Sequence, residues 1–364
     1  MAIPPTRPAL ENSDLVRPDW FSTPGRESSK LWLDKNENMD PALQALIQNV
    51  ISEIPREIYS SYPDLSELYR KLANSLDVNE TELLLAAGSD GAIRAVFETF
   101  VTPGDVVFYL QPTFAMYSVY SKIHGARVIP VEYARGEQEP LLDSERLMAE
   151  IEKNKPRLVC IANPNSPTGT VIEERTLHRI IKQAESIGTV VLVDEAYYPF
   201  YPHTLLDSVS SYSNLVVTRT TAKAWGLAGL RIGYSISNTE LNQFLHKSRP
   251  MYEIGNLSAE VFKCMLDHET EMLQSVQRLN DGKRFFDQAM QNLGFSVIEG
   301  HGNFSHVAFE GLADRVHSKI SKLAYYRHTQ EDECLKGYSR FSATTVEKIQ
   351  PVVEAIEKIV AAQS

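Results

Sequence analysis

The stretch TVVLVDEAYY, residues 189–198, is an apolar run that ends on a carboxylate, Asp194. Similar runs recur along the chain, rich in valine, isoleucine and leucine and bounded by polar residues, glycine or proline, as is typical of buried strands. They cover Leu83–Ala87, Val106–Leu110, Leu158–Ala162, Val190–Val193, Leu215–Thr218 and Ile232–Ile236. Segments with helical spacing lie between them, at Asp90–Phe100, Tyr117–His124 and Glu173–Ser186. This alternation predicts an α/β fold with a mostly parallel sheet covered by helices on both faces.

The pattern changes after Ser237. Long helical stretches between Ser258 and Gln291 are followed by shorter apolar segments and helices, which indicates a smaller α+β domain. These segments are Phe295–Ile298, Phe304–Phe309, a helix near Leu312–Leu323, Tyr338–Ser342 and a final helix from Thr345. The proline-rich first thirty residues are expected to form an extended arm. We therefore predict an arm and part of the small domain in 1–50, a large cofactor-binding domain in 51–249 and the small C-terminal domain in 250–364.

The composition excludes several classes of protein. The chain has 364 residues, 43% of them hydrophobic and 23% charged, and a net charge of -11, which argues against nucleic acid or an anionic membrane surface as the main partner. Its three cysteines have no paired spacing, so neither a disulfide framework nor a metal site is predicted. No apolar run approaches the length of a secretion signal or a membrane span. We expect a cytoplasmic protein.

Open parallel sheets bind ligands beyond the carboxyl ends of their strands, which directs attention to the residues after each apolar run. The segment TTAKAWGLAGLRIGY, residues 220–234, contains Lys223. A lysine amine becomes a covalent catalyst when it meets a carbonyl group, and pyridoxal phosphate provides an aldehyde together with an anion and a ring nitrogen. Lys223 could form the Schiff base, Arg231 and Thr220 could bind the phosphate, and Asp194 could keep the ring nitrogen protonated. The alternative is a solvated surface lysine in a glycine-rich loop.

Other strand ends carry residues that suit the same ligand. Gly88, Ser89 and Asp90 lead into a helix whose first amide groups could bind a phosphate, although an ordinary helix cap would also explain them. Phe114 could stack on a flat ring, or could simply belong to the core. Asn165 lies in the rigid loop NPNSPTG, residues 163–169, where its amide could reach a phenolic oxygen, although a plain turn explains the prolines and glycine equally well.

Asp194 and Tyr197 complete this set. A carboxylate at the end of a buried strand is costly unless it is paired, and a protonated pyridine nitrogen is a suitable partner. Tyr197 could donate a hydrogen bond to the phenolate oxygen of the ring. Glu195, between them, is expected to point elsewhere.

The motifs GSDGAIR, PTFAMY, NPNSPTG, DEAYYPF and TTAKAWGLAGLRIGY, in this order and spacing, resemble the fold type I pyridoxal-phosphate enzymes of the class I/II aminotransferase superfamily, and among them the histidinol-phosphate aminotransferases. The resemblance extends from about Leu31 to the C-terminus. It implies that Lys223 bonds to pyridoxal 5'-phosphate and moves the proton, that Asp194 pairs with the ring nitrogen, and that Tyr197 and Asn165 contact the phenolate oxygen. It further implies that Phe114 stacks on the ring, and that the phosphate is surrounded by Gly88, Ser89, Asp90, Thr220 and Arg231.

The resemblance also implies a partner subunit and a substrate site. Tyr62 matches a tyrosine that reaches the phosphate of the neighbouring subunit's cofactor, which implies a homodimer with a shared active site. Arg327 and Arg340 match two arginines that bind acidic groups of substrates, and Asn36 lies in a motif near the substrate. Ser166, however, stands where many members have a second asparagine, and the sequence around Arg340, YSRFSATT, departs from the family's usual pattern.

Three functions follow as hypotheses. The first is an aminotransferase that moves an amino group between an amino donor, for example glutamate, and a small phosphorylated or acidic keto or aldehyde substrate. The second is a decarboxylase, lyase or cyclase that uses the same cofactor on an amino acid or phospho-amino acid. The third is a protein that binds the cofactor without catalysis, against which the intact Lys223 argues. The identity of the donor and the acceptor is not encoded in these motifs.

Overall fold

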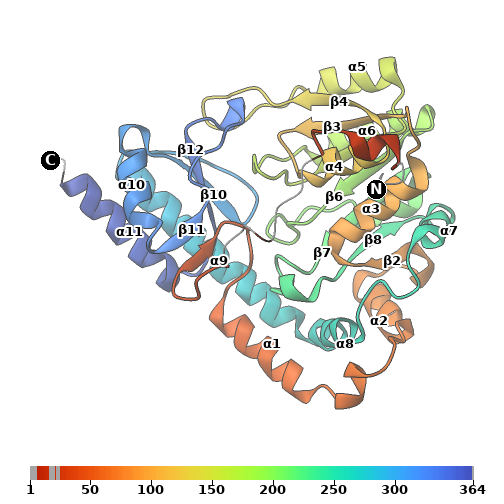
Figure 1. Cartoon of the computed structure of the whole chain (residues 1–364), viewed down its shortest axis with the longest axis horizontal. Helices are drawn as coiled ribbons and strands as arrows, with labels where there is room; N and C mark the ends of the chain where they lie inside the picture. Colours follow the sequence, from red (N-terminus) through yellow and green to blue (C-terminus); the bar gives the residue numbers. More distant parts are fainter. Residues whose placement is uncertain (1–5, 16–20, 22–24, 363–364) are drawn as a thin grey trace, which may run out of the picture.

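The computed structural model describes residues 6–15, 21 and 25–362, and it has a larger and a smaller part, each built on a sheet (Figure 1). The larger sheet has seven strands in the order β2-β8-β7-β6-β5-β3-β4. They are β2 (Leu83–Ala86), β3 (Val106–Gln111), β4 (Arg127–Glu132), β5 (Leu158–Ala162), β6 (Val190–Asp194), β7 (Leu215–Thr220) and β8 (Gly233–Ser237). Among these strands, β8 runs antiparallel to both of its neighbours, β2 and β7, and the other pairs are parallel. The predicted α/β fold with a mostly parallel sheet is confirmed.

Alternate side chains of each strand enter two different cores, which is why the strands read as continuous apolar runs. In β6, Val191 and Val193 face one core, while Val190 and Leu192 face the other. Helices α2, α5 and α6 contribute to the first core, and α3, α4 and α7 to the second. These helices are α2 (Ser66–Leu76), α3 (Gly88–Phe100), α4 (Met116–Ile123), α5 (Ser144–Asn154), α6 (Glu174–Ser186) and α7 (Thr239–Ser248).

The smaller part has a three-stranded antiparallel sheet in the order β12-β10-β9 and a parallel pair of strands, β1 and β11. The strands are β1 (Leu31–Leu33), β9 (Ser296–Ile298), β10 (Phe304–Ala308), β11 (Ala324–Tyr326) and β12 (Tyr338–Ser342), and the helices are α9 (Glu269–Asn292), α10 (Ala313–Ile320) and α11 (Val346–Ala361). Because β1 pairs with β11, the segment Leu31–Leu33 lies beside the strands that follow α9 in the sequence.

Two helices connect the parts. Helix α1 (Pro41–Glu53) contacts both α8 (Asn256–Met265) and α9. Helix α8 buries Val261 and Phe262 in the first core of the large sheet, although it follows position 250. The domain limits at 50 and 249 remain a proposal. The 3-10 helices are Pro8–Glu11, Arg56–Tyr59, Glu80–Glu82, Leu206–Ser211, Ala228–Leu230, Leu266–His268, Glu310–Leu312 and Glu333–Leu335.

The helical stretches predicted between 258 and 291 are confirmed as α8 and α9, which the 3-10 turn Leu266–His268 separates. Other local predictions were wrong. Strand β4 was missed because it is an edge strand with exposed positions and a proline, Pro130. The expected extended arm is a 3-10 helix at Pro8–Glu11, near α4, while residues 1–5, 16–20 and 22–24 lie outside the described part.

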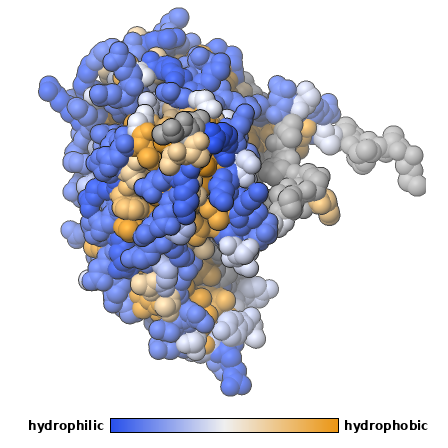
Figure 2. Space-filling view, turned by 90° about the vertical axis from the view of Figure 1, so that its left-hand side faces the viewer, coloured by the Kyte–Doolittle hydropathy of each residue, from blue (hydrophilic) through white to orange (hydrophobic). Residues whose placement is uncertain are grey.

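The surface agrees with the composition. On the side that carries α10 and α11, hydrophilic residues dominate and small hydrophobic areas lie between them (Figure 2). Within residues 6–15, 21 and 25–362, no helix combines the length and the apolar character needed to span a membrane. The three cysteines, Cys160, Cys264 and Cys334, are free.

Candidate active site

The loop between β7 and β8 begins and ends at the same edge of the large sheet, because β8 runs antiparallel to β7. Strand β7 ends at Thr220, whose register partner on β8 is Gly233, the first residue of that strand. Gly233 also pairs with Ala86, at the end of β2. The chain therefore leaves the carboxyl edge after Thr220, carries Lys223, and returns to the same edge with Arg231, next to the start of α3.

Asp194 is the last residue of β6 and is buried. Its carboxylate accepts hydrogen bonds from Thr218 Oγ1 at 3.0 Å and from Tyr117 Oη at 3.4 Å. Burial raises its pKa to about 6, and these two donors only partly offset that effect. The carboxylate is thus a buried acid that a neighbouring cation would return to its charged form, which fits a protonated ring nitrogen.

Lys223 is half-buried, and its Nζ donates a hydrogen bond to the carbonyl oxygen of Lys35 at 2.7 Å. Burial lowers its pKa to about 8, assisted by the positive charges of Arg340 and Arg231 and opposed by Glu37 and Asp194. Near neutral pH a much larger fraction of this amine is uncharged than for an ordinary lysine, and the uncharged amine is the nucleophilic form.

We expect the rate at which the apoprotein takes up pyridoxal phosphate to follow this amine. The observed rate should rise about tenfold for each pH unit below 8 and level off above that value, because the neutral fraction saturates at the pKa. Stopped-flow absorbance of the bound cofactor measures this profile. A rate that continues to rise up to the pKa of an ordinary lysine would contradict the lowered value.

An anion site lies where α3 begins. Gly88 has a φ of 78°, and a Cβ atom added to it would lie 2.7 Å from Arg231 Nη2, so the guanidinium group sits directly against the first turn of α3. The amide groups of this turn, the helix dipole and the guanidinium group all favour an anion. Ser89 belongs to the same turn, and Thr220 lies at the end of β7 with its Oγ1 accepting from the amide of Ala222.

Asp90 can contribute to this site through its main chain alone. Its carboxylate accepts a hydrogen bond from Tyr120 Oη at 3.0 Å, and a carboxylate would repel a phosphate. Its amide group, by contrast, belongs to the first turn of α3 and has no partner within the helix. The predicted place of Asp90 beside the phosphate is therefore assigned to its main-chain amide.

Replacing Arg231 by glutamine should weaken cofactor binding about ten to a hundredfold. The side chain would lose a charged hydrogen bond, which contributes about 1.5–3 kcal/mol. The cofactor is first removed without denaturant, and equilibrium dialysis then measures the dissociation constant of the cofactor in each variant. Arg94→Gln is the matched control, because Arg94 lies on α3 but pairs with Glu98 at the surface. Unchanged retention in the Arg231 variant would remove Arg231 from the anion site.

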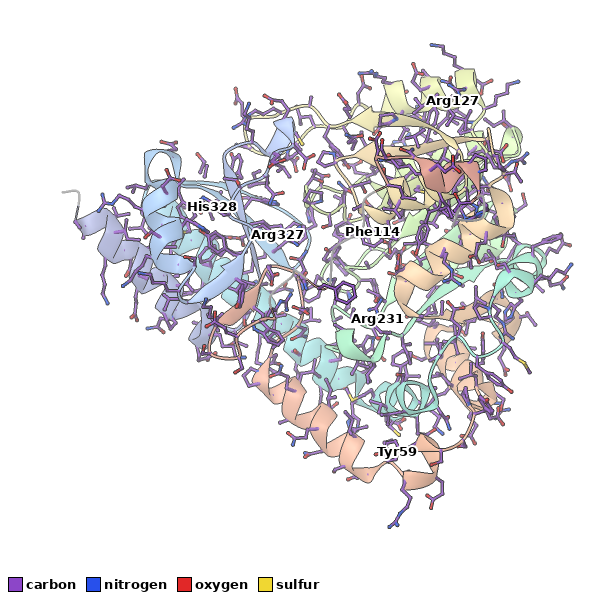
Figure 3. The ribbon with its side chains drawn as sticks, viewed as in Figure 1. Tyr59, Phe114, Arg127, Arg231, Arg327 and His328 are labelled. Carbon is purple, nitrogen blue, oxygen red and sulfur yellow. The ribbon has the colours of Figure 1, made fainter. Side chains whose placement is uncertain are left out.

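Phe114 follows β3 and contacts Tyr117 edge to face, with ring centroids 5.7 Å apart. Figure 3 shows Phe114 and Arg231 near the middle of the molecule, beside the smaller part that carries Arg327. Tyr62 lies elsewhere: its side chain is 78% exposed and stacks on Tyr252 at 4.5 Å. The structure therefore gathers Phe114 with the other site residues of this chain, and leaves Tyr62 on the surface.

The prediction for Asn165 needs correction. Its Nδ2 donates to the carbonyl oxygen of Pro112 and to Thr168 Oγ1, each at 2.8 Å, and its Oδ1 accepts from Thr113 at 2.6 Å. Both amide hydrogens are used to fix the loop, and none is left for a phenolate oxygen. The next residue, Ser166, has its hydroxyl 3.4 Å from Arg340 Nη1. Sequence alone does not show which way the asparagine of such a loop points.

Tyr197 and Asn36 lie together, although 161 residues separate them in sequence. Asn36 Nδ2 donates to Tyr197 Oη at 2.8 Å, and both side chains are buried. Burial raises the pKa of Tyr197, which keeps its phenol protonated. Asn36 was predicted to contact substrate, but the structure directs its amide group to Tyr197.

Arg327 and Arg340 are register partners in an antiparallel bridge. Both guanidinium groups donate to the same carbonyl oxygen, that of Asp34, from Arg327 Nε at 3.3 Å and Arg340 Nη2 at 3.1 Å. Arg340 also lies over the ring of Phe304, 5.4 Å from its centroid. Among the described residues, neither arginine has a carboxylate within ion-pair distance, which leaves two cations available to an anionic ligand.

The segment around the predicted residue Asn36 connects these groups, through contacts that the sequence did not predict. Within residues 34–38, main-chain carbonyl oxygens accept hydrogen bonds from both arginines and from Lys223. The side-chain amide of Asn36 donates to Tyr197, and that of Asn38 donates to the carbonyl oxygen of Ala224 at 3.0 Å. Tyr117 and Thr218, the partners of Asp194, were missed as well. Main-chain acceptors and hydroxyl groups carry no motif that would have marked them.

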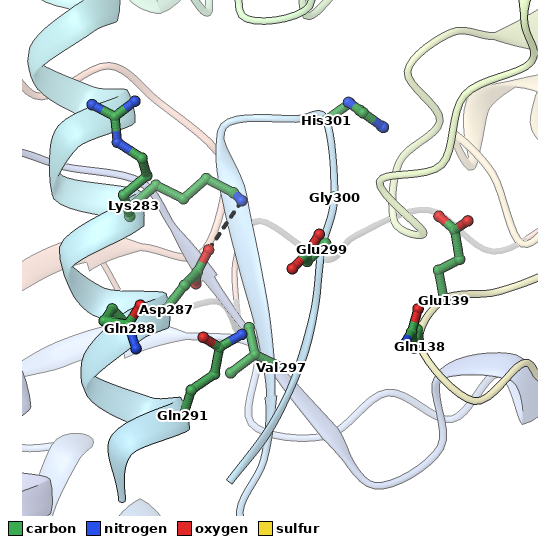
Figure 4. A pocket seen from close by; sticks show the side chains of 11 residues that line it. Gln138, Glu139, Lys283, Asp287, Gln288, Gln291, Val297, Glu299, Gly300 and His301 are labelled. Carbon is green, nitrogen blue, oxygen red and sulfur yellow. Dashed lines mark hydrogen bonds and ion pairs between the residues drawn. The ribbon is translucent and has the colours of Figure 1, made fainter. Parts of the chain in front are cut away.

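These residues fit pyridoxal phosphate in three respects. A buried acid without a cationic partner lies at one end, a helix start with an adjoining guanidinium group at the other, and a partly neutral lysine between them. A separate cavity of about 720 Å³ lies between α9, the β9–β10 hairpin and residues Gln138 and Glu139, and is lined by none of the predicted site residues (Figure 4). In the part of the chain that the structure describes, no three His, Cys, Asp or Glu residues are grouped to hold a metal ion.

Comparison with known proteins identifies the family of the chain. The sequence pattern of the family described as Aminotransferase class I and II matches residues 28–356. The histidinol-phosphate aminotransferase of Caldanaerobacter subterraneus subsp. tengcongensis is 33% identical over 334 residues, which cover 91% of this chain and 93% of that protein. The enzyme of the same name from Thermoanaerobacter pseudethanolicus is 33% identical over 333 residues, 90% of this chain and 92% of that protein.

Solved structures agree in fold. The histidinol-phosphate aminotransferase of Sinorhizobium meliloti in complex with pyridoxal-5'-phosphate superposes with a TM-score of 0.83 at 19% identity, covering 100% of this chain and 99% of that one. The L-threonine-O-3-phosphate decarboxylase of Porphyromonas gingivalis has a TM-score of 0.74 at 19% identity, covering 91% and 99%. On the strength of the family match and the sequence relatives, we conclude that the chain is an enzyme of the aminotransferase class I and II family.

Proposed function

We propose that this enzyme transfers an amino group between an amino-acid donor such as glutamate and a small keto or aldehyde acceptor that bears a phosphate or carboxylate. The observation that carries this proposal is the pair Arg327 and Arg340, whose guanidinium groups face one carbonyl oxygen and, among the described residues, no carboxylate. The names of the sequence relatives favour histidinol phosphate and its keto counterpart as the first substrates to test.

The cofactor is pyridoxal 5'-phosphate, and the residues that would hold it are those gathered at the edge of the large sheet. When bound, it supplies an aldehyde for attachment and a cationic ring that accepts the electron pair released at the substrate's α carbon. We assign Arg231, Thr220 and the first-turn amides of Gly88, Ser89 and Asp90 to its phosphate. Phe114 is assigned to its ring face, and Asp194 and Tyr197 to its ring nitrogen and phenolic oxygen.

The chain's own groups then divide the work. Lys223, with its pKa lowered to about 8, can carry a proton on Nζ or release it near neutral pH, as a general acid and base requires. Arg340 and Arg327 bind and orient the acidic groups of the substrate. Orientation decides which bond is broken, so these two arginines also decide between transamination and decarboxylation.

Half-reactions test the proposal. The purified holoenzyme is mixed with glutamate, and the conversion of the bound cofactor to its amino form is followed by absorbance, with 2-oxoglutarate measured as the product. Histidinol phosphate and dephosphorylated histidinol are then compared as amino donors, and the phosphorylated compound is expected to react with the higher kcat/KM. Equal kcat/KM values for the two compounds would contradict the proposal that the enzyme recognises a phosphate group on its substrate.

The second hypothesis has its own outcome in this experiment. A fold shared with an L-threonine-O-3-phosphate decarboxylase, and the unusual surroundings of Arg340, keep decarboxylation, elimination and cyclisation in the test. Release of carbon dioxide or a cyclic product from an amino acid or phospho-amino acid, with no amino transfer from any donor, would replace the transaminase proposal by this one.

We further propose that the protein forms a homodimer in which Tyr62 completes the active site of the partner subunit. We also propose that it is located in the cytoplasm. Support comes from a cluster of exposed apolar residues, Tyr59, Tyr62, Met251 and Tyr252, of which Tyr62 and Tyr252 stack on each other. Exposed aromatic groups of this kind mark interaction surfaces. The free cysteines are compatible with a reducing compartment.

Hybrid dimers test the shared site. Tyr62→Ala and Lys223→Ala are each expected to be strongly impaired, but a mixture that is unfolded and refolded together should regain up to about a quarter of the wild-type activity. That gain arises because a hybrid dimer contains one site with neither change. The control is the same mixture without refolding, and activity that never exceeds the sum of the separate variants would contradict a shared site.

A further inference from the structure

The contact between Asn36 and Tyr197 joins the two parts of the molecule inside the active site. Asn36 follows β1 of the smaller part, and Tyr197 follows β6 of the large sheet. The distance of 2.8 Å between Asn36 Nδ2 and Tyr197 Oη is that of a good hydrogen bond. Both residues are buried, so water does not compete for this contact.

The direction of the Asn36 amide group is fixed by its other partners. Ser342 Oγ accepts a hydrogen bond from the main-chain N–H of Asn36 at 2.8 Å. The same hydroxyl group donates its own hydrogen to the side-chain oxygen Asn36 Oδ1 at 3.1 Å. Asn303 Nδ2 donates to the carbonyl oxygen of Asn36 at 3.1 Å. With Oδ1 occupied by a donor, Nδ2 is the atom that faces Tyr197. The left-handed backbone of Asn36, with a φ of 57°, is one that asparagine tolerates well.

The hydrogen atoms can then be counted. A phenol has one O–H donor and can also accept. Because the oxygen of Tyr197 accepts from Asn36, its own hydrogen can be donated to another oxygen; the Ser166 hydroxyl also lies within hydrogen-bonding reach of this phenol. A donor that is itself accepting a hydrogen bond is polarised and donates more strongly.

We propose that Asn36 is a positioning residue for Tyr197, which holds the phenol oxygen so that its hydrogen is directed to the phenolic oxygen of the cofactor. This inference rests on the proposed placement of the cofactor. It assigns Asn36 a role different from substrate binding.

The neighbouring loop supports this role of Asn36. The amide hydrogens of Asn165 are used within the loop, and Ser166 replaces the second asparagine found in many similar proteins. The hydroxyl of Ser166 is engaged by Arg340. The side-chain amide that acts beside the phenol therefore comes from the N-terminal segment instead of from the loop.

The test is a pH titration of the visible absorption of the bound cofactor, without substrate. Hydrogen bonds donated to the phenolic oxygen stabilise its anionic form, so losing one raises the pH midpoint of the absorption change. We expect Asn36→Gly and Asn36→Asp to raise this midpoint by about half a unit to one unit. Glycine accepts the left-handed backbone without a side chain, and aspartate keeps the shape but has no N–H donor.

Tyr197→Phe provides the background in which the effect must disappear. If Asn36 acts through the phenol, Tyr197→Phe raises the midpoint, and adding Asn36→Gly changes it no further. Melting temperatures of the wild type and the four variants are measured in parallel, and a midpoint shift that persists in Asn36→Asp at unchanged melting temperature excludes a general loss of structure.

Two results would overturn the inference. One is a midpoint that stays at the wild-type value in Asn36→Asp while the KM of the substrate rises, which would return Asn36 to the substrate site. The other is an equal shift in the Tyr197→Phe background. Both results can be distinguished from failure of the proposed cofactor site. In that case the wild-type protein would have no cofactor bound at Lys223, and no pH-dependent change of visible absorption would be seen.

Discussion

Lys223→Ala should reduce the rate of amino transfer about ten-thousandfold or more, because the change removes both the nucleophile and the group that moves the proton. The pyridoxal phosphate should still bind, through the anion site and Asp194, but without a covalent link. Borohydride reduction followed by peptide mass mapping measures the link directly: in the wild-type protein the cofactor should be fixed to Lys223, and in the variant to no residue.

Lys348→Ala is a closely matched control. Lys348 is also a partly buried lysine, its pKa is also lowered by burial, and its Nζ donates to the carbonyl oxygen of Met39 at 2.8 Å, in the same N-terminal region. This variant should keep the cofactor link and most of the activity. A link found at Lys348 or elsewhere in the wild-type protein, or normal turnover by Lys223→Ala, would remove the basis of the proposed function.

Asp194→Asn should lower kcat/KM about a hundredfold to several thousandfold. Loss of one partner of a buried charge pair costs about 3–5 kcal/mol, and each 1.4 kcal/mol changes a rate about tenfold. Asparagine can still accept from Thr218 Oγ1, and its Nδ2 can donate to Tyr117 Oη, so the fold should persist while the ring nitrogen loses its negative partner. Steady-state kinetics and the dissociation constant of the cofactor measure the effect.

Glu195 offers the matched control, since it is the next residue and is equally buried. Its carboxylate pairs with Arg219 at 3.0 Å and accepts from the amide of Leu205 at 2.7 Å, so it serves the fold. Glu195→Gln should lower the melting temperature but leave the absorption of the bound cofactor unchanged. The assignment of Asp194 would be wrong if the two variants changed the cofactor spectrum to the same extent.

The sequence was informative where one physical signal dominates. Strands β5 and β12 begin and end at the predicted residues, because buried strands between polar boundaries are plain in the pattern. The clustering of Asp194, Lys223 and Arg231 was predictable too, since strand ends of a parallel sheet meet at one edge. Three-residue strands such as β1 and β11 are too short to show a period, and they were missed.

The polar contacts of the site were less predictable. Asn165 and Asn36 are both asparagines in motifs near the ligand, and a sequence does not reveal that one amide is used within its own loop while the other crosses to Tyr197. The contact of Lys223 with the Lys35 carbonyl spans 188 residues and involves a main-chain atom, which any residue type would provide. Such partners depend on the three-dimensional path of the backbone.

The carbonyl oxygen of Asp34, to which both Arg327 and Arg340 donate, affects how readily an anion can bind to these two arginines. Arg327 and Arg340 are aimed at a common point by a neutral oxygen, and the ring of Phe304 shields one of them. An arriving phosphate or carboxylate therefore exchanges places with a weak acceptor and has no strong ion pair to break. Recognition can proceed without a large rearrangement of these two side chains, and its strength should fall as the salt concentration rises, since it depends on attraction between opposite charges.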